Sequence, residues 1–309
     1  MIVHIFKNNF EIQKDRKWVF TLGVFDGVHS GHQYVIDFLK NLAETENSET
    51  ALMTFDPHPR FVLQPDTDFK LLTTLEEKIL LLEQFGVQNI IIQEFSKDFS
   101  RLSALEFVRD ILVKKFQIHS LIIGYDQKFG KNRDGNFEHL QNLAKTFHFD
   151  LLRLPSVNKN ETTVSSTKIR NLLEKGEIEQ ANQYLGYEFI MTGTVAHGDR
   201  IGRTIGFPTA NLEIDPQKIC PKNGVYIVKV SIDNEVFTGM MNIGMRPTFG
   251  GGLKRQLEVH ILNFNRNIYG KKIPIHFLDR IRDEKKFATK NELIKQLEED
   301  KKKTEKFFL

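Results

Sequence analysis

The sequence contains few of the features that mark secreted, membrane-bound or cysteine-based proteins. Cys220 is the only cysteine among 309 residues, which excludes an intramolecular disulfide and a zinc cluster built on several thiolates. No apolar run approaches the length of a membrane span, and the N-terminus lacks the pattern of a secretory signal. We therefore expect a cytoplasmic protein with no membrane partner, in which Cys220 is a passive residue of a turn.

The chain also lacks a large excess of charge of one sign. The chain has 43 lysines and arginines against 40 acidic residues, and a net charge of +3 is too small to indicate a nucleic-acid partner. The run of three lysines at 301–303 is typical of a solvated helix face. Neither a G-x-x-x-x-G-K-[ST] loop nor a G-x-G-x-x-G fingerprint is present, so a phosphate site must be of another kind. The length and the 40% hydrophobic content predict two globular domains that act on small molecules, and the oligomeric state is not indicated.

A glycine-bearing stretch from Thr21 to His32 organises the first half of the chain. It follows the apolar run 18–20 and precedes apolar residues at helical spacing in 35–42, which predicts a strand, a tight turn and a helix. His29 and His32 stand where the helix begins, and there the free N–H groups and the helix dipole favour an anion. The alternative is an ordinary turn with two surface histidines, and the short motif alone does not separate the two.

Strand and helix patterns alternate through the first half. The sequence predicts strands at 51–55, 89–92 and 120–124 and helices at 75–85 and 103–116. Ser103 and Glu106 form a capping box, and Gly86 suits the position after a helix end. Such alternation predicts a doubly wound α/β fold with a parallel sheet, in which ligands bind beyond the carboxyl ends of the strands.

Three further polar stretches follow these strands. In 54–59, two prolines stiffen a turn that would aim Asp56 and His58 toward a ligand, although the pattern alone favours a merely rigid loop. The stretch 124–130 suits a nucleotide or an aromatic ring, and also an ordinary polar loop. In 165–170, hydroxyl residues would cap a helix that ends near residue 176, while two cations in its first turn oppose the helix dipole unless a polyphosphate binds there.

The stretches 23–32, 54–59 and 165–170 together resemble the FMN adenylyltransferase half of bacterial bifunctional FAD synthetases, a Rossmann-like member of the H-x-G-H nucleotidyltransferase superfamily. The resemblance implies adenylyl transfer from ATP to FMN with release of pyrophosphate. It assigns ATP and phosphate contacts to Gly23, Phe25, Asp26, His29, His32, Ser166, Thr167 and Arg170, of which the two histidines are also catalytic. It assigns flavin or nucleotide contacts to His58, Gly124, Asp126 and Phe129. Gln127 departs from the aromatic residue or histidine that relatives often carry.

The second half has a different pattern. A short helix at 177–185 is closed by Gly186, and there we place the boundary between domains 1–185 and 186–309. The predicted strands that follow are 189–195, 224–230, 236–241 and 256–262, separated by turn residues. They predict a small antiparallel β-barrel followed by a terminal helix, which begins at Thr289 with a capping box to Glu292.

Two patterns in this half carry chemistry. The segment 193–211 is rich in glycine and basic residues, and it suits either phosphates or a flexible loop. Thr209 and Asn211 lie two residues apart, so an extended chain points both oxygens to one side, where they suit Mg²⁺ beside ATP. Glu258 and His260 alternate with apolar residues, and Glu258 is a natural general base if it faces a nucleotide rather than solvent.

These patterns resemble riboflavin kinase. The matching stretches are 206–211, 223–226, 242–248, 258–260 and 282–287. The resemblance implies ATP contacts at Gly198, Gly202, Arg203, Gly206, Thr209 and Asn211, metal contacts at Thr209 and Asn211, flavin contacts at Arg282 and Glu284, and Glu258 as the base on the riboflavin 5′-hydroxyl. Asn263 departs from the usual aspartate.

Both resemblances together predict a bifunctional enzyme that makes FMN from riboflavin and FAD from FMN, with ATP and Mg²⁺ at each step. Two alternatives are an enzyme with one decayed half and a flavin-binding regulator without activity. The motif residues present in both halves disfavour the first. The presence of Glu258 and His32 disfavours the second, because a pure binding protein needs no base.

Overall fold

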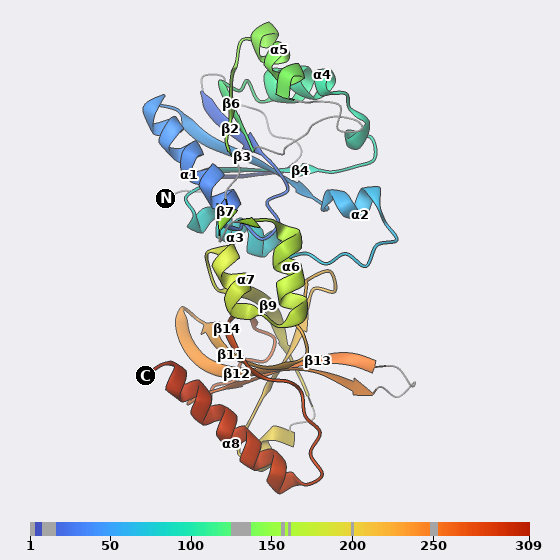
Figure 1. Cartoon of the computed structure of the whole chain (residues 1–309), viewed down its shortest axis with the longest axis vertical. Coiled ribbons are helices and arrows are strands. Elements are labelled where there is room, and N and C mark those ends of the chain that lie inside the picture. Colours follow the sequence, from blue (N-terminus) through green and yellow to red (C-terminus); the bar gives the residue numbers. More distant parts are fainter. Residues whose placement is uncertain are drawn as a thin grey trace. The chain divides into compact units, whose positions relative to one another are not determined.

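A computed structural model gives the fold (Figure 1) and describes residues 4–7, 17–124, 137–155, 158–159, 162–198, 201–247 and 253–309. The chain forms two compact units. The first comprises Met1–Phe69 and Leu75–Ser165, and the second comprises Lys70–Thr74 and Ser166–Leu309. Helices α6 (Ser166–Lys175) and α7 (Ile178–Leu185) therefore group with the second unit. The domain boundary expected at residues 185 and 186 stays a prediction about independent folding.

The first unit contains a parallel sheet. Its strands are β1 (His4–Lys7), β2 (Trp18–Leu22), β3 (Glu49–Asp56), β4 (Asn89–Glu94), β5 (Ser120–Ile123) and β6 (Asp150–Arg153), in the order β1-β4-β3-β2-β5-β6. The three strands expected after residue 50 are confirmed. The sequence reading missed β1 and β6, because each has two apolar residues between polar ones and so forms no apolar run.

Helices cover both faces of this sheet. They are α1 (Ser30–Thr45), α2 (Pro59–Leu63), α3 (Leu75–Gln84), α4 (Ala104–Glu106), the π-helical η2 (Phe107–Lys115) and α5 (Phe137–Phe147), with the short 3₁₀ turn η1 (Phe99–Arg101). Alternate residues of β2 enter different cores: Trp18 and Phe20 pack with η2 and α5, whereas Val19 packs with α1. The doubly wound arrangement is confirmed (Figure 1).

Two helix ends predicted from the sequence are confirmed, while the interior of the helix predicted at 103–116 differs. Ser103 and Glu106 form both bonds of the capping box, and Gly86 has a φ of +89° after α3. The segment expected as one helix over 103–116 begins as α4 and continues as η2, with Phe116 N–H bonded to the Ile111 carbonyl five residues earlier.

The strand order places the switch point of the sheet beside β2. The chain proceeds from β2 to β3 and β4 on one side, and β5 and β6 lie on the other. The carboxyl ends of β2 and β5 therefore border the crevice where doubly wound sheets bind ligands. The turn 23–29 follows β2, and Gly124 follows β5.

The second unit contains a closed antiparallel barrel, as expected. Its strands are β9 (Phe189–Ala196), β10 (Ala210–Ile214), β11 (Gly224–Ile232), β12 (Glu235–Pro247), β13 (Leu253–Ile261) and β14 (Lys272–Arg282), in the order β10-β13-β12-β11-β14-β9. The sequence reading missed β10 and β14, and also η4 (Ile201–Ile205) and the two-residue strands β7 (Asn158–Lys159) and β8 (Thr162–Thr163).

The terminal helix α8 (Lys290–Phe307) begins at the expected cap. The Thr289 hydroxyl accepts a bond from Glu292 N–H, while the Glu292 carboxylate accepts from Ala288 N–H rather than from Thr289. Asp300 and Thr304 on this helix are buried, and α8 packs against β12. The segment 70–74 also joins this unit, through a bridge between Leu71 and Lys218.

Candidate active sites

The turn after β2 places two histidines in contact at the start of α1. His29 is the N-cap residue, and its Nδ1 accepts a bond from His32 N–H at 3.4 Å. The two imidazole rings stack with centroids 3.7 Å apart, and the Phe25 ring lies 4.9 Å from that of His32. One of the free N–H groups expected to attract an anion is therefore already bonded to His29, and the histidines form a single preorganised pair.

His32 carries an unsatisfied polar atom. Its Nδ1 is buried and has no hydrogen-bond partner in the part of the chain that the structure describes. The pKa of His32 lies well below its usual value of 6.5, first because of burial and then because of the charges of His29 and Lys78. A neutral imidazole with an unpaired nitrogen is an arrangement typical of a binding site, since buried polar atoms are otherwise bonded.

The remaining residues of this turn are packed closely around the pair. Phe25 and Asp26 are buried, and a Cβ at Gly23 would lie 3.0 Å from the Phe25 ring. Phe25 and Val28 have positive φ values of 50° and 33°, conformations that side chains rarely adopt. Strained backbone of this kind clusters at functional sites.

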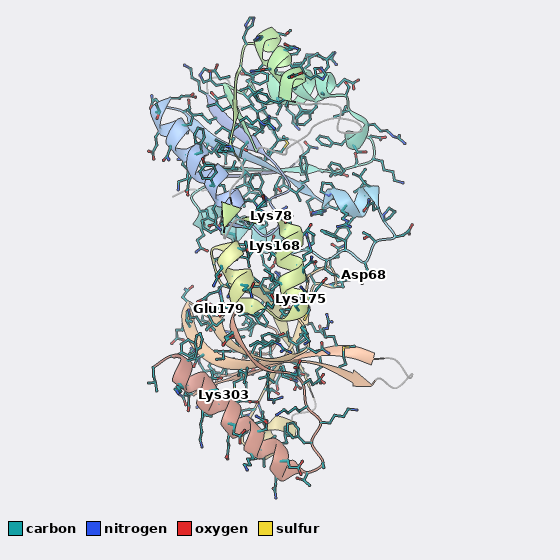
Figure 2. The ribbon with its side chains drawn as sticks, viewed as in Figure 1. Asp68, Lys78, Lys168, Lys175, Glu179 and Lys303 are labelled. Carbon is teal, nitrogen blue, oxygen red and sulfur yellow. The ribbon has the colours of Figure 1, made fainter. Side chains whose placement is uncertain are left out.

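Lys78 is a residue of this region that the sequence reading missed. It lies on α3 (Figure 2), is 6% exposed, and donates hydrogen bonds near the carboxyl ends of β2 and β3. Leu81 and Leu82, three and four residues further along, are also buried. A lysine on the apolar face of a predicted helix was the signal that could have found it.

His58 has a local structural partner. It is the N-cap residue of α2, where its Nδ1 accepts a bond from Arg60 N–H at 3.0 Å. Its ring lies 4.6 Å from the ring of Phe69, over which the Arg60 guanidinium also packs. Of the other predicted flavin contacts, Gly124 directly follows β5, whereas Asp126 and Phe129, with Gln127, lie outside the described residues.

The hydroxyl and basic residues predicted to bind polyphosphate lie at the start of α6, within the second unit. They are Ser166, Thr167 and Arg170. The Nε of Arg170 donates to the Lys70 carbonyl at 2.8 Å, and Lys168 packs its ammonium 4.1 Å from the Tyr184 ring centroid on α7. Figure 2 labels Lys168 and Lys175 on α6 and Glu179 on α7. The cations that oppose the helix dipole thus have partners within the protein.

In the barrel, the predicted base and a predicted metal ligand stand side by side. Asn211 of β10 pairs directly with Glu258 of β13. The Gln256 amide lies on the same side of β13, and its Nε2 donates to Asn211 Oδ1 at 3.3 Å and to Glu258 Oε1 at 2.8 Å. Sequence reasoning missed Gln256, although its spacing of two from Glu258 places it on the same face.

The alternation expected along β13 is confirmed. Its apolar residues Leu257, Val259 and Ile261 are buried, while Glu258 and His260 are partly exposed. His260 Nδ1 lies 2.7 Å from the Pro208 carbonyl, which only accepts, so this nitrogen carries the proton. Burial lowers the pKa of His260, and the bond to Pro208 opposes that shift. His260 thereby holds the chain just before Thr209.

The segment before β10 contains glycines that closely approach Asn211 and Phe207. A side chain at Gly198 would overlap the amide of Asn211, and one at Gly202 would overlap the Phe207 carbonyl. Arg203 lies in η4, and Gly206 has a φ of +82°. The close approach explains why glycine stands at 198 and 202.

Of the predicted flavin contacts of the barrel, Arg282 has a protein partner, and Glu284 lies close to Gly244. The Nε of Arg282 donates to both carboxylate oxygens of Asp300 at 3.1 and 2.9 Å, and Asp300 is fully buried. The Glu284 carboxylate lies so close to Gly244 that a side chain there would displace it. The described contacts of Arg282 are therefore structural.

Comparison with known proteins finds two family models in tandem. The model described as FAD synthetase matches residues 11–168, and the model described as riboflavin kinase matches residues 185–308. The first covers strands β2 to β6 of the parallel sheet and the H-x-G-H turn, and the second covers the barrel with Asn211 and Glu258.

Full-length relatives have the same combined description. Proteins named bifunctional riboflavin kinase/FMN adenylyltransferase are 40% identical in Listeria monocytogenes (94% of this chain and 92% of the relative), 37% identical in Bacillus subtilis (99% and 98%) and 36% identical in Escherichia coli (94% and 92%). The chain thus spans nearly the whole length of each relative.

A solved structure has the same fold. The crystal structure of a Streptococcus pneumoniae protein named a macrolide-efflux protein is similar over 99% of both chains, with a TM-score of 0.89 and 32% identity. Efflux is a description of that protein alone. Among the residues described for the present chain, no helix combines the length and the apolar character needed to cross a bilayer.

Proposed function

Because the chain belongs to the family of bifunctional riboflavin kinases/FMN adenylyltransferases, we propose that it converts riboflavin to FMN and then FMN to FAD, with one ATP consumed in each step. The observation that carries this proposal is the presence of two separate polar sites in the order of the two family models. The stacked pair His29 and His32 lies in the first unit, and the group formed by Asn211, Gln256 and Glu258 lies in the second.

In the kinase step, Glu258 is the general base. Its carboxylate accepts the proton of the riboflavin 5′-hydroxyl as that oxygen attacks the γ-phosphorus of ATP. The bond between the γ-phosphorus and the bridging oxygen breaks, and ADP leaves with its electron pair. Glu258 is partly exposed, so a substrate can reach it, and Gln256 fixes one of its oxygens. A hydroxyl is a poor nucleophile while protonated, and a positioned base contributes roughly 10²–10⁴-fold.

The oxygens of Thr209 and Asn211 suit Mg²⁺ in this site. The Gln256 amide donates to Asn211 Oδ1 and so fixes that oxygen, which keeps a second lone pair for a metal ion. Bound Mg²⁺ would neutralise charge on the ATP phosphates during transfer. Gly198, Gly202, Arg203 and Gly206 are proposed to line the ATP phosphates, and Glu284, with Arg282, to border the flavin.

In the adenylyl-transfer step, no covalent enzyme intermediate is needed. A phosphate oxygen of FMN is already anionic; it attacks the α-phosphorus of ATP, and pyrophosphate leaves. His29 and His32 position the ATP phosphates at the start of α1 and stabilise the charge that develops on them. Ser166, Thr167 and Arg170 are proposed as further phosphate contacts, Gly23, Phe25 and Asp26 as the wall of the ATP site, and His58, Gly124, Asp126 and Phe129 as the flavin contacts.

One assay tests the proposed function. The full-length protein is incubated with riboflavin, ATP and Mg²⁺, and riboflavin, FMN and FAD are separated by chromatography over time. We expect FMN to appear first and FAD to follow from it. FMN alone would indicate a monofunctional kinase, and neither product would indicate a flavin-binding protein. A cytoplasmic location is expected for such an enzyme, since its single cysteine tolerates a reducing compartment.

A further inference from the structure

Lys78 is a buried lysine whose charge, after burial and the charge of His29, lowers the pKa of His32 in the H-x-G-H turn. Its ammonium group has three N–H donors. They donate to three acceptors, the Val24 carbonyl at 3.2 Å, the Thr54 hydroxyl at 2.9 Å and the Phe55 carbonyl at 3.3 Å. Lys78 is 6% exposed. Taking an ammonium group out of water costs free energy even when its bonds are satisfied, so this residue occupies the site at a cost in stability.

The three acceptors lie on two different strand ends. Val24 opens the turn that leads from β2 to His29, whereas Thr54 and Phe55 lie near the carboxyl end of β3. The Thr54 hydroxyl also donates to the Val24 carbonyl at 2.9 Å, which closes the network. The Lys78 ammonium therefore holds the turn 23–29 against the end of β3, beside the switch point of the sheet.

We propose that Lys78 is a positioning residue for adenylyl transfer, whose buried ammonium group fixes the H-x-G-H turn to the end of β3 and supplies a positive charge beneath the paired histidines. This inference rests on the proposed role of that turn in FAD formation. The charge has two consequences. It adds to the burial that keeps His32 neutral, and it adds to the positive field that favours the phosphates of ATP.

The charges around Lys78 make the proposal measurable. Burial lowers the pKa of Lys78 to about 8, and the nearby carboxylates of Asp26 and Asp56 oppose that shift. The pKa of His32 is in turn lowered by burial and then by the charges of His29 and Lys78. The ammonium form is thus present at neutral pH and is lost as the pH rises through about 8. The kcat/KM of FAD formation, which reports the free enzyme, should therefore fall on the alkaline side.

The test uses the full-length protein with FMN, ATP and Mg²⁺. It measures kcat/KM for FAD formation from about pH 5.5 to about pH 9.5, a range that includes the Lys78 pKa of about 8. Lys78→Met removes the ammonium and keeps the stem. We expect it to lower kcat/KM at neutral pH by roughly 10²-fold, as misplacement of a site does, and to abolish the alkaline limb. Thr54→Val removes one link and keeps the charge; it should lower kcat/KM less and keep the limb.

Lys145→Met on α5 is the matched control, because Lys145 is exposed in the same unit, and its profile should match that of the wild type. Riboflavin phosphorylation should be unchanged in all three variants. The proposal is overturned if Lys78→Met, with intact phosphorylation, keeps the wild-type kcat/KM and alkaline limb. If Lys78→Met does not fold, a wild-type kcat/KM in Thr54→Val overturns it. Failure of the wild type to make FAD from FMN would instead overturn the function on which the proposal rests.

Discussion

Asn211 and Glu258 stand directly opposite each other on β10 and β13, and a single amide, Gln256 Nε2, donates to an oxygen of each. This relationship joins a proposed metal ligand and a proposed base into one hydrogen-bonded group. The strand pairing sets the spacing of the two residues, and the shared donor orients one oxygen of each side chain.

Replacing Gln256 with methionine should weaken the kinase step alone. The substitution keeps the volume but removes the donor, so Glu258 and Asn211 lose their common anchor. We expect riboflavin phosphorylation to fall by roughly 10-fold, the lower end of the effect of residues that orient ligands. Steady-state kinetics with riboflavin and ATP measure this. FAD synthesis from supplied FMN is the internal control, and phosphorylation at the wild-type rate would contradict the orienting role.

Arg282 should prove important for stability. Its guanidinium binds the fully buried carboxylate of Asp300, so Arg282→Met leaves an uncompensated charge in the interior. The expected loss is about 3–5 kcal/mol in the free energy of unfolding, measured by denaturant titration of the barrel transition. The double variant Arg282→Met/Asp300→Leu should recover much of that loss, because no charge remains unpaired.

A surface pair provides the control for that experiment. Arg266 and Glu235 form an ion pair in which both side chains are largely exposed, so Arg266→Met should change the free energy of unfolding by no more than about 1 kcal/mol. An equal loss in Arg282→Met and Arg266→Met would show that burial of Asp300 does not determine the cost.

The first unit should lose stability in mild acid. The folded state lowers the pKa of His32, so below the usual value of 6.5 the unfolded chain binds more protons than the folded one. Stability is therefore fully present above pH 6.5 and declines as the pH falls toward the folded pKa. Denaturant titrations at several pH values measure this slope for the wild type and for His32→Gln, which has no ring to protonate. Equal slopes would show that His32 is not the titrating group.

The limits of the barrel unit can be tested with fragments. A fragment 166–309 keeps α6 and α7, whereas a fragment 186–309 removes them. Asn182 on α7 donates to the Phe277 carbonyl and accepts from Phe189 N–H, and four residues of α7 are buried. We expect 166–309 to unfold at the higher temperature in circular dichroism melts. Equal melting temperatures would support the boundary placed at residues 185 and 186.

The sequence predicted the architecture well because the patterns that define it are local. The strands β3, β4 and β5 stand out as continuous apolar runs, and Gly86, Ser103 and Gly186 mark helix ends through their own backbone chemistry. Strands such as β1 and β10, with four and five residues, depend on partners distant in sequence. No window of the chain contains that information.

The candidate sites show the same division between features that are local in sequence and features that depend on distant contacts. The histidine turn and the Asn211 and Glu258 positions were found from motifs within one segment. Lys78 and Gln256 were missed, because their importance comes from what they contact: Lys78 joins two strand ends, and Gln256 joins two strands. Conversely, Lys168 suggested a phosphate site by its place in a helix, and the structure pairs it with Tyr184.

The central claim is that two separate sites carry the two reactions, and one comparison tests it most directly. The wild type, His32→Ala and Glu258→Gln are each supplied with riboflavin or with FMN, together with ATP and Mg²⁺, and product formation is followed by chromatography after circular dichroism has verified the fold. His32→Ala should phosphorylate riboflavin normally and lose roughly 10²-fold in FAD formation, as expected for a lost phosphate contact. Glu258→Gln should lose roughly 10²–10⁴-fold in phosphorylation and still make FAD from FMN. If either folded variant loses both activities together, the assignment of separate sites is contradicted.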